Sequence, residues 1–349
     1  MTITEAIKQT VEGRSLSSEQ AEAVLEQIMS GQCSDAQIAA LLTALRMKGE
    51  TVDEIIGFAR VMRRRAAPVR PQSLVGSEIA GTEREALIDT CGTGGDVSGS
   101  FNVSTATALV VAGCGVRVAK HGNRSVSSQC GSADVVEALG VRIELAPPLI
   151  AACIDEVGIG FLHAPLLHEA MKHVGPARRQ MGIRTIFNML GPLTNPAGAD
   201  TQVIGVYAAP LTEMLAAALR ALGSRRALVV HGSDGLDEIS ISAESKVTEL
   251  AEGELRTYTV MPEDFGLRRA SLEAIRGGDA RQNSAIILEV LRGEPGPRRD
   301  IVLLNAAAAL VASRRASDFT EGVRLAAEAI DSGKAMMKLE RLIEFTNAR

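Results

Sequence analysis

The sequence Asp89-Thr-Cys-Gly-Thr-Gly-Gly-Asp96 follows the short apolar run Ala86–Ile88 and precedes the segment Ser100-Phe-Asn-Val-Ser-Thr105. Its three glycines fall within four positions, and glycines allow successive backbone N–H groups to converge on an anion. The hydroxyl and amide residues that follow open a helix of small residues, whose N-terminus adds unpaired donors and a favourable dipole. The pattern is typical of a phosphate-binding loop between a strand and a helix.

A second anion-binding segment, Lys120-His-Gly-Asn-Arg-Ser-Val-Ser-Ser128, follows within one βα unit. The glycine-rich loop alone is a weak signal, because its glycines could serve only a tight turn. It lacks the Gly-Lys-Ser/Thr of a Walker A loop, and its glycines do not follow the dinucleotide spacing G-x-G-x-x-G. We therefore do not expect the phosphate to belong to ATP or NAD.

Together, the two segments resemble the anthranilate phosphoribosyltransferase family, whose loops read Gly-Thr-Gly-Gly-Asp and Lys-His-Gly-Asn-Arg. The resemblance continues in the same order through three further blocks, which are Gly131-Ser-Ala-Asp134, Gly191-Pro-Leu-Thr-Asn-Pro196 and His231-Gly-Ser-Asp-Gly-Leu-Asp-Glu238. Five blocks spread over the chain make a chance match very unlikely.

Composition places the 349-residue chain among globular proteins with one large or two ordinary domains. A net charge of −5 argues against binding to bulk nucleic acid, which usually requires a basic face. The five cysteines show no C-x-x-C pair, and Met1–Lys8 shows no export signal. No apolar run is long enough to cross a bilayer. We therefore expect a cytoplasmic protein with reduced thiols.

Residues 1–67 are predicted to be helical. Ser17 or Ser18 can cap a helix that ends near Gly31, and Ser34 can cap one that ends near Gly49. Thr51 with Glu54 forms a capping box that opens the helix 52–65. This bundle is short for an independent core, so its faces are expected to pack on the rest of the chain or on a second subunit. Residues 68–85 are predicted to be a linker.

Residues 86–349 alternate short strands with helices, which indicates an α/β domain with a mostly parallel central sheet flanked by helices. Residues 238–258 alternate apolar and polar positions, which favours an antiparallel excursion. Residues 271–347 return to helices, notably 301–313 and 319–331. The strands are predicted at 87–89, 116–119, 160–162, 203–207 and 227–230.

The resemblance implies that 5-phosphoribosyl pyrophosphate is one substrate and that the amine of anthranilate is the nucleophile. Breaking the bond between ribose C1 and pyrophosphate oxygen leaves positive charge on the ribose and added negative charge on the pyrophosphate. Catalysis should therefore come mainly from stabilising the leaving group and aligning the amine. An aromatic amine is neutral at pH 7, so no strong base is needed.

The family roles, carried onto matching positions, assign a large set of residues to phosphoribosyl pyrophosphate. Lys120 and Asn123 are in addition implied to be catalytic, with Asn123 at the junction of the two substrates. Asn102 to Thr105 could instead be only a helix cap, although capping and ligand binding use the same groups. The set comprises Gly92, Gly95, Asp96, Ser100, Asn102, Val103, Ser104, Thr105, Lys120, His121, Gly122, Asn123, Arg124, Ser127, Ser128 and Ser132.

Arg178 lies at the position where the family places the arginine that binds the anthranilate carboxylate, and it is counted among the catalytic residues. A planar guanidinium suits a planar carboxylate. Arg179 is the adjacent competitor, and spacing favours Arg178. The other residues implied to line the anthranilate site are Gly92, His121, Asn123, Gly191 and Pro192.

Asp237 and Glu238 are adjacent carboxylates after a glycine-containing turn, which suits Mg²⁺ held by a few carboxylates and by substrate phosphate oxygens. Alone, such a pair would more simply be a solvated acidic turn. The resemblance adds the hydroxyl of Ser104 as a ligand and implies two Mg²⁺ ions. His168 and His173 are five residues apart and do not share one helix face, so a zinc site is not expected.

Two other functions remain open at this stage. One is a pyrimidine nucleoside phosphorylase of related architecture, which would not need the Gly191–Pro196 block or the Asp-Glu pair. The other is a non-catalytic nucleic-acid-binding relative, which the intact Lys120–Arg124 loop and the acidic balance disfavour. The family is commonly dimeric through its helical region, so a homodimer without membrane or nucleic-acid partners is expected.

Overall fold

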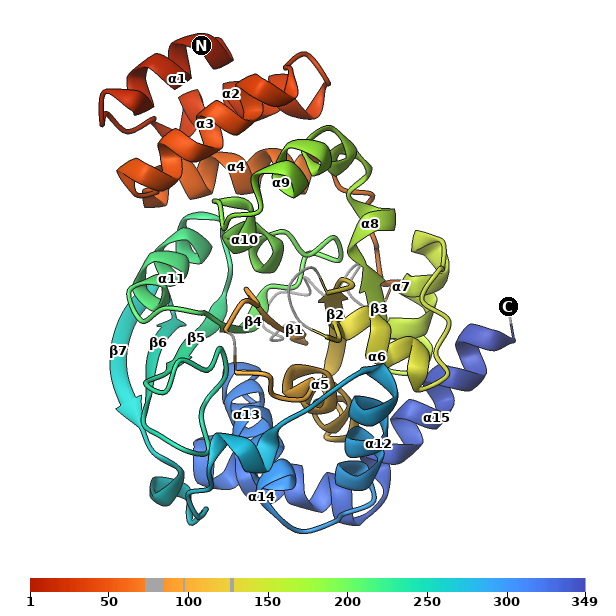
Figure 1. Cartoon of the computed structure of the whole chain (residues 1–349). Helices are drawn as coiled ribbons and strands as arrows, with labels where there is room; N and C mark the ends of the chain where they lie inside the picture. Colours follow the sequence, from red (N-terminus) through yellow and green to blue (C-terminus); the bar gives the residue numbers. More distant parts are fainter. Residues whose placement is uncertain (73–84, 97, 126–128, 349) are drawn as a thin grey trace.

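The computed structural model describes residues 1–72, 85–96, 98–125 and 129–348. Its first four helices form a bundle at one end of the molecule (Figure 1). Each helix begins with a capping box, in which the side chain of the residue before the helix accepts an N–H of the first turn. The predicted caps Ser17, Ser34 and Thr51 are confirmed. The helices are α1 (Ile3–Val11), α2 (Ser18–Met29), α3 (Asp35–Lys48) and α4 (Val52–Arg65).

A seven-stranded sheet forms the centre of the larger part, in the order β3-β2-β1-β4-β5-β6-β7. The first five strands in this order are parallel, and β6 and β7 are antiparallel additions at one edge. The mostly parallel sheet and the antiparallel excursion are therefore confirmed. The strands are β1 (Leu87–Gly92), β2 (Arg117–Gly122), β3 (Ile159–His163), β4 (Thr201–Gly205), β5 (Arg226–Gly232), β6 (Ser245–Ala251) and β7 (Glu254–Val260).

The five predicted strands are present, but apart from the start of the first strand their predicted bounds are wrong by one to three residues. The first strand was expected to end at Asp89, but β1 continues to Gly92 because Thr90, Cys91 and Gly92 pair with β4. Asp89 is therefore a buried strand residue. The fourth strand was expected to include Tyr207, whose N–H instead donates to the hydroxyl of Thr93.

Helices cover both faces of the sheet (Figure 1). Leu228 and Val230 of β5 belong to the hydrophobic cluster that includes α5, α12, α13, α14 and α15, whereas Val229 between them belongs to the cluster that includes α11 and the N-terminal bundle. The bundle thus shares one hydrophobic core with the sheet, as its small size led us to expect. The helices on the first face are α5 (Val103–Gly113), α12 (Ala280–Leu291), α13 (Pro297–Ala312), α14 (Phe319–Asp331) and α15 (Lys334–Asn347).

Shorter helices connect the strands. The predicted bounds of α14 are confirmed, whereas α13 begins four residues before the predicted Ile301, with Pro297 in its first turn. No helix in the part of the chain that the structure describes is long and apolar enough to cross a membrane. The connecting helices are α6 (Ser132–Ala138), α7 (Pro147–Glu156), α8 (Ala164–Leu167), α9 (Gly175–Met181), α10 (Phe187–Leu190) and α11 (Leu211–Ala221).

The order of the strands places a topological switch point between β1 and β4. The chain proceeds from β1 to β2 and β3 on one side, and then returns to β4 and β5 on the other. In open α/β sheets, ligands bind at the carboxyl ends of the strands where the order reverses in this way. The glycine-rich loop leaves β1 at this point, so the fold itself directs attention to that loop.

Candidate active site

The glycine-rich loop meets the acidic pair at the carboxyl ends of β1 and β4. Gly94 and Gly95 have positive φ angles of 65° and 80°, which suit glycine. The N–H of Gly94 donates to Oδ2 of Asp237 at 3.0 Å. A Cβ atom on Gly92 would lie 2.6 Å from the same oxygen, so Gly92 leaves room for the carboxylate. The loop therefore aims a backbone donor at an anionic group.

Three carboxyl groups, from Asp96, Asp237 and Glu238, lie close together here. Burial raises the pKa of Asp237, and the neighbouring Asp96 raises it further. Burial and then Asp237 raise the pKa of Glu238, whose carboxylate accepts the N–H of Ser104. The three predicted metal-binding residues Ser104, Asp237 and Glu238 are thus brought together.

The chemistry of these oxygen donors fits Mg²⁺. Crowded, partly buried carboxylates repel one another, and a divalent cation relieves the repulsion. Among the described residues, no three His, Cys, Asp or Glu side chains converge into a ready metal cage. Mg²⁺ in proteins commonly takes one or two carboxylates and completes its shell with water and substrate phosphate oxygens.

The loop that carries the acidic pair is held by buried polar contacts. Oδ1 of Asn305, on α13, accepts the N–H of Ile239 at 2.9 Å, and its Nδ2 donates to the carbonyl of Ile239 at 3.0 Å. The hydroxyl of Ser240 donates to Oδ2 of Asp234 at 2.6 Å. Gly205 permits close packing, because a Cβ there would collide with the carbonyl oxygen of Asp237.

Lys120 contributes a buried positive charge next to the site. Its side chain is buried, and Nζ donates to the carbonyl of Thr90 at 2.5 Å and to the hydroxyl of Ser104 at 3.3 Å. Burial raises the pKa of Asp89, and the positive charge of Lys120 partly offsets this rise. The Lys120 charge also offsets the rise in the pKa of Glu238. Its direct contact with phosphate stays a prediction.

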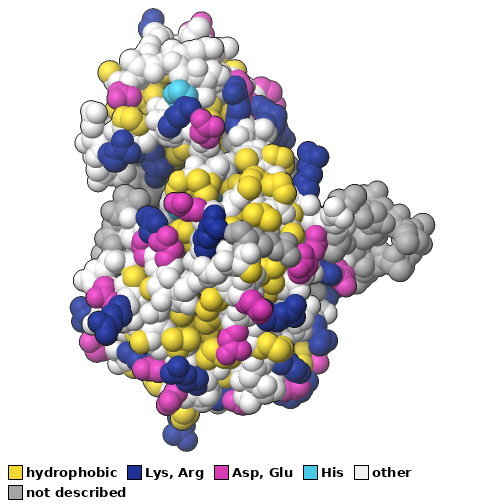
Figure 2. Space-filling model, turned by 90° about the vertical axis from the view of Figure 1, so that its right-hand side faces the viewer, with side chains coloured by type: hydrophobic (Ala, Val, Ile, Leu, Met, Phe, Trp, Pro, Cys, Tyr) yellow, Lys and Arg dark blue, Asp and Glu magenta, His cyan; other side chains and the backbone are white. Residues whose placement is uncertain are grey.

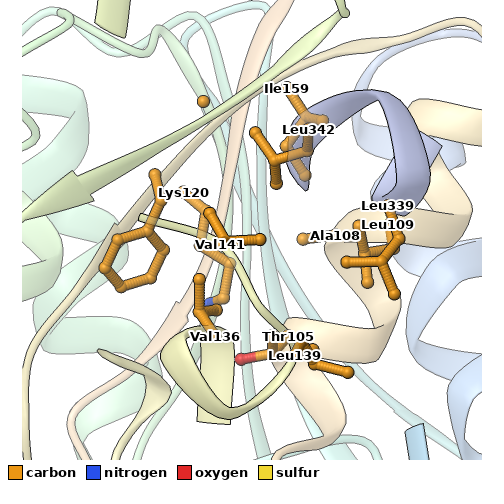
Figure 3. A pocket seen from close by; sticks show the side chains of 12 residues that line it. Thr105, Ala108, Leu109, Lys120, Val136, Leu139, Val141, Ile159, Leu339 and Leu342 are labelled. Atoms are coloured by element: carbon orange, nitrogen blue, oxygen red, sulfur yellow. The ribbon is translucent and has the colours of Figure 1, made fainter. Parts of the chain in front are cut away.

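A small cavity of about 20 Å³ lies inside the core beside Lys120 (Figure 3). Apolar side chains of α5, β3, α15 and the segment 136–141 line most of it, and Thr105 contributes a hydroxyl that has no hydrogen-bond partner among the described residues. The cavity holds little more than one water molecule. The predicted binding residues Val103 and Thr105 are both buried, so their side chains contribute to the core. A larger cavity, of about 220 Å³, lies near Arg63 and Asp200, away from the acidic pair.

The second predicted loop begins at the end of β2. Asn123 is exposed, and its N–H donates to the hydroxyl of Ser132 at 3.2 Å, which brings these two predicted residues together. Arg124 points to α6, where Nη1 lies 3.0 Å from Asp134 and 2.5 Å from Glu137. Ser127 and Ser128 lie outside the described residues.

Ser100 and Asn102 lie between the glycine-rich loop and α5. The hydroxyl of Ser98 lies 3.2 Å from that of Ser100 and also donates to Asp96. Asn102 occupies the position before α5 but makes no capping bond with its side chain. Its Oδ1 instead accepts from Nδ2 of Asn283 at 2.9 Å. Its Nδ2 donates to the carbonyl of Cys130 at 3.3 Å, so the side chain joins neighbouring segments and does not cap α5.

Arg178 and His168 lie on the segment that follows β3, and His121 lies at the end of β2. The guanidinium of Arg178 lies over the ring of Phe187, 5.4 Å from its centroid, and burial lowers its pKa. No acidic partner for Arg178 is found within the described ranges of the chain. Burial lowers the pKa of His121 to about 3 and that of His168 to about 4. Both imidazoles are thus neutral at pH 7.

The Gly191–Pro192 wall is fixed next to these groups. Nδ1 of His121 lies 3.2 Å from the carbonyl of Gly191, and Nε2 of Gln202 donates to the carbonyl of Pro192 at 2.7 Å. Nε2 of His121 is buried with no hydrogen-bond partner among the described residues. Three predicted anthranilate residues, His121, Gly191 and Pro192, are therefore brought together.

The sequence alone missed Arg184, Asn195 and Asn305. Arg184 donates to the carbonyl of Gly95, and Nδ2 of Asn195 bridges Asp89 and the carbonyl of Ala119 at 2.8 Å each. Asn195 falls within a quoted block, but nothing local indicates its partner. Arg184 and Asn305 fall outside every block, and no pattern in the sequence distinguishes them from ordinary helix or loop residues.

On one face of the molecule, charges of both signs are interspersed over the larger part, and hydrophobic side chains gather where it meets the helical bundle (Figure 2). Large apolar side chains on the outer surface include Met47 of α3, which is 84% exposed, and Val11 of α1, which is 71% exposed.

The fold and the site define a glycosyl transferase. The chain belongs to the glycosyl transferase family that combines a helical bundle domain, matched by residues 4–66, with an a/b domain, matched by residues 84–336.

Within this family, the chain is similar to anthranilate phosphoribosyltransferases over nearly its full length. It is 55% identical to that of Citrifermentans bemidjiense over 352 residues, with 99% of each chain covered. It is 57% identical to that of Symbiobacterium thermophilum over 341 residues, with 98% of this chain and 97% of the relative covered. These relatives support the predicted phosphoribosyl transfer to anthranilate. They do not support the nucleoside phosphorylase or nucleic-acid-binding alternatives.

Solved structures agree with the sequence relatives. The anthranilate phosphoribosyltransferase of Thermus thermophilus superposes with a TM-score of 0.90 at 45% identity, covering 98% of this chain and 99% of its own. The Saccharomyces cerevisiae enzyme in complex with PRPP and Mg superposes with a TM-score of 0.88 at 28% identity, covering 99% and 98%.

Proposed function

We propose that the carboxyl ends of β1 and β4 are where this chain transfers the 5-phosphoribosyl group of phosphoribosyl pyrophosphate to the amine of anthranilate. The products are N-(5-phosphoribosyl)anthranilate and pyrophosphate, in tryptophan biosynthesis. The observation that carries the proposal is the meeting of Gly94, Asp237 and Glu238 at the point where the strand order reverses. Full-length similarity to anthranilate phosphoribosyltransferases supports the same reaction.

In this reaction the bond between ribose C1 and the pyrophosphate oxygen breaks, and the amine nitrogen forms a bond to C1. The backbone N–H groups of Gly94 and Gly95 and the N-terminus of α5 stabilise the departing pyrophosphate charge. Ser100, Asn102, Asn123, Arg124 and Ser132 are proposed to hold the rest of this substrate. Lys120 adds positive charge from beneath the loop.

Mg²⁺ is proposed as the cofactor, as two ions, because the carboxylates fit it and because a yeast relative is described with PRPP and Mg. Asp237, Glu238 and the hydroxyl of Ser104 would hold it, with Asp96 beside them. When bound, it would neutralise charge on the pyrophosphate.

Arg178 is proposed to bind the anthranilate carboxylate. Its half-buried guanidinium lies over Phe187, and a partly desolvated charge is costly unless an anion accompanies it. The Gly191–Pro192 wall and His121 lie at the same edge of the sheet. A yeast relative described in complex with 4-fluoroanthranilate superposes with a TM-score of 0.87 at 27% identity.

The loss of anthranilate fluorescence tests the proposed reaction. Purified protein should consume anthranilate only when phosphoribosyl pyrophosphate and Mg²⁺ are both present, and omission of either should stop the loss. Uridine or thymidine with inorganic phosphate should give no free base. A folded protein that leaves anthranilate untouched would refute the proposal.

The two-domain division at residues 68–85 and a homodimer through the helical part also remain proposals. Met47 and Val11 support the homodimer, because large exposed apolar side chains on a small bundle favour association. Met47→Glu and Val11→Glu should yield monomers in light scattering. Met337→Glu, on α15, should leave the mass unchanged. An unaltered mass in all three variants would contradict the proposed interface.

A further inference from the structure

Arg184 contacts the glycine-rich loop from a distant part of the chain. It lies between α9 and α10, six positions after Arg178. Its guanidinium donates to the carbonyl oxygen of Gly95. A Cβ atom on Gly95 would lie 3.1 Å from Nε of Arg184 and 3.3 Å from its Cζ, so a side chain at Gly95 would crowd the guanidinium.

This contact fixes one peptide unit of the loop. The peptide that joins Gly95 to Asp96 is planar and trans, so its carbonyl and its N–H point in opposite directions. Because Arg184 holds the carbonyl, it also sets the direction of the Asp96 N–H. Gly95 has a φ of 80°, and glycine alone would leave this peptide free to rotate.

Tyr207 supports the guanidinium from the other side. The Cζ atom of Arg184 lies 4.7 Å from the centroid of the Tyr207 ring, which suits a cation–π contact. The N–H of Tyr207 donates to the hydroxyl of Thr93 at 3.2 Å, and the N–H of Thr93 donates to the carbonyl of Gly205 at 2.9 Å. The end of β4 therefore anchors both the glycine-rich loop and the ring on which Arg184 lies.

The same position connects to the helical bundle. Arg46 and Glu50, at the end of α3, both interact electrostatically with the Tyr207 hydroxyl. They also form a pair at 3.9 Å, in which the Glu50 side chain is 7% exposed. Arg184 thus lies where the bundle, the end of β4 and the glycine-rich loop meet.

We propose that Arg184, supported by Tyr207, is a positioning residue for the pyrophosphate half of the substrate. It orients the Gly95–Asp96 peptide so that the Asp96 N–H and carboxylate face the leaving group, without itself touching the reacting atoms. The inference rests on the proposed function. It also means that one short segment, from Arg178 to Arg184, serves both substrates.

Steady-state kinetics of Arg184→Met and Tyr207→Leu test this role. Methionine keeps the length of the stem but removes the donors and the charge. The KM for phosphoribosyl pyrophosphate should rise about tenfold or more, since a hydrogen bond from a charged donor is lost. The KM for anthranilate should change by less than about threefold, because Arg178 is intact. Calorimetric binding of pyrophosphate with Mg²⁺ should weaken in parallel.

Conservative variants separate positioning from general destabilisation. Arg184→Lys keeps the charge and can reach the carbonyl but cannot stack its plane, so it should recover part of the loss. Tyr207→Phe keeps the ring and should match the wild type. Arg256→Met is the matched control, because Arg256 lies over Tyr258 on β7 at 5.6 Å with no contact to the loop. It should leave both KM values unchanged.

The outcomes are distinguishable from a failure of the proposed function. If the wild type does not consume anthranilate, the proposed function fails. If the wild type is active but Arg184→Met and Tyr207→Leu retain its KM for phosphoribosyl pyrophosphate, the role of Arg184 is refuted. Equal rises in both KM values would also refute it. If Arg184→Met does not fold, the results for Tyr207→Leu and Arg184→Lys decide.

Discussion

The carboxylate of Asp237 accepts a hydrogen bond from the backbone N–H of Gly94 at 3.0 Å, although 143 positions separate the two residues. The neighbouring Glu238 accepts the N–H of Ser104 in the first turn of α5. Each carboxylate of the acidic pair therefore accepts a backbone N–H that belongs to the proposed phosphate site. An incoming pyrophosphate can share these donors only if a cation compensates the added negative charge.

Removing either charge should raise the requirement for Mg²⁺. Asp237→Asn and Glu238→Gln keep the size of each side chain but weaken the oxygen ligands. We expect both variants to lose activity and to need more Mg²⁺ for half-maximal rate, measured at saturating phosphoribosyl pyrophosphate.

Glu244→Gln is the control for this pair, because Glu244 is an exposed carboxylate on the same connection. It should behave as the wild type. If Asp237→Asn and Glu238→Gln lose activity with an unaltered Mg²⁺ dependence, a direct proton-transfer role becomes the better interpretation.

Replacing Arg178 should affect one substrate far more than the other. Arg178→Ala removes the proposed charge-assisted contact to the anthranilate carboxylate, which corresponds to about 2–3 kcal/mol in kcat/KM for anthranilate. The KM for phosphoribosyl pyrophosphate should change little. Arg179, whose side chain is exposed, provides the comparison. A larger defect in Arg179→Ala would contradict this assignment and would place the anthranilate carboxylate on Arg179.

The two buried histidines should make stability fall in acid. Burial holds the pKa of His121 at about 3 and that of His168 at about 4. In the unfolded chain both would bind protons near pH 6.5. As the pH falls below about 6.5, the unfolded state gains protons that the folded state does not, so the free energy of unfolding decreases.

Denaturant titrations at pH 7 and pH 5 measure this effect. His168→Gln should lose less stability between these two values than the wild type, because one of the two groups has been removed. An equal loss in the variant and the wild type would show that His168 is not held neutral in the folded chain.

Asn305 should stabilise both the fold and the metal-binding loop. Asn305→Leu keeps the branched shape of the side chain but leaves the N–H and carbonyl of Ile239 without their partner, at roughly 2–5 kcal/mol of stability. Because Ile239 follows Glu238, the Mg²⁺ requirement should also rise. Thr346→Val removes a buried hydroxyl on α15 that accepts the N–H of Arg142, and it should lower stability without changing the Mg²⁺ requirement. The same Mg²⁺ shift in both variants would exclude a specific role for Asn305.

Local chemistry explains why much of the fold was predictable. The capping boxes at Ser17, Ser34 and Thr51 involve residues three positions apart, so the sequence contains the whole interaction. The end of β1 was missed because Gly92 is held in the strand by Gly205, far along the chain. The strand order likewise depends on pairing between distant segments.

The candidate site divides in the same way. Gly94, Asp237, His121 and Gly191 stand in blocks with a recognisable order, and the structure brings them to one edge of the sheet. Arg184 and Asn305 were not predicted, because their partners Gly95 and Ile239 lie 89 and 66 positions away. Thr105 matched by position, but its side chain is buried beside an internal cavity, which sequence order alone does not show.

A crystal structure of this chain with phosphoribosyl pyrophosphate, Mg²⁺ and anthranilate would test the central claim most directly. The account predicts pyrophosphate on the N–H groups of Gly94 and Gly95, Mg²⁺ between the pyrophosphate and the Asp237–Glu238 pair, and the anthranilate carboxylate on Arg178. Pyrophosphate bound away from the carboxyl ends of β1 and β4, or a carboxylate paired with another residue, would contradict it.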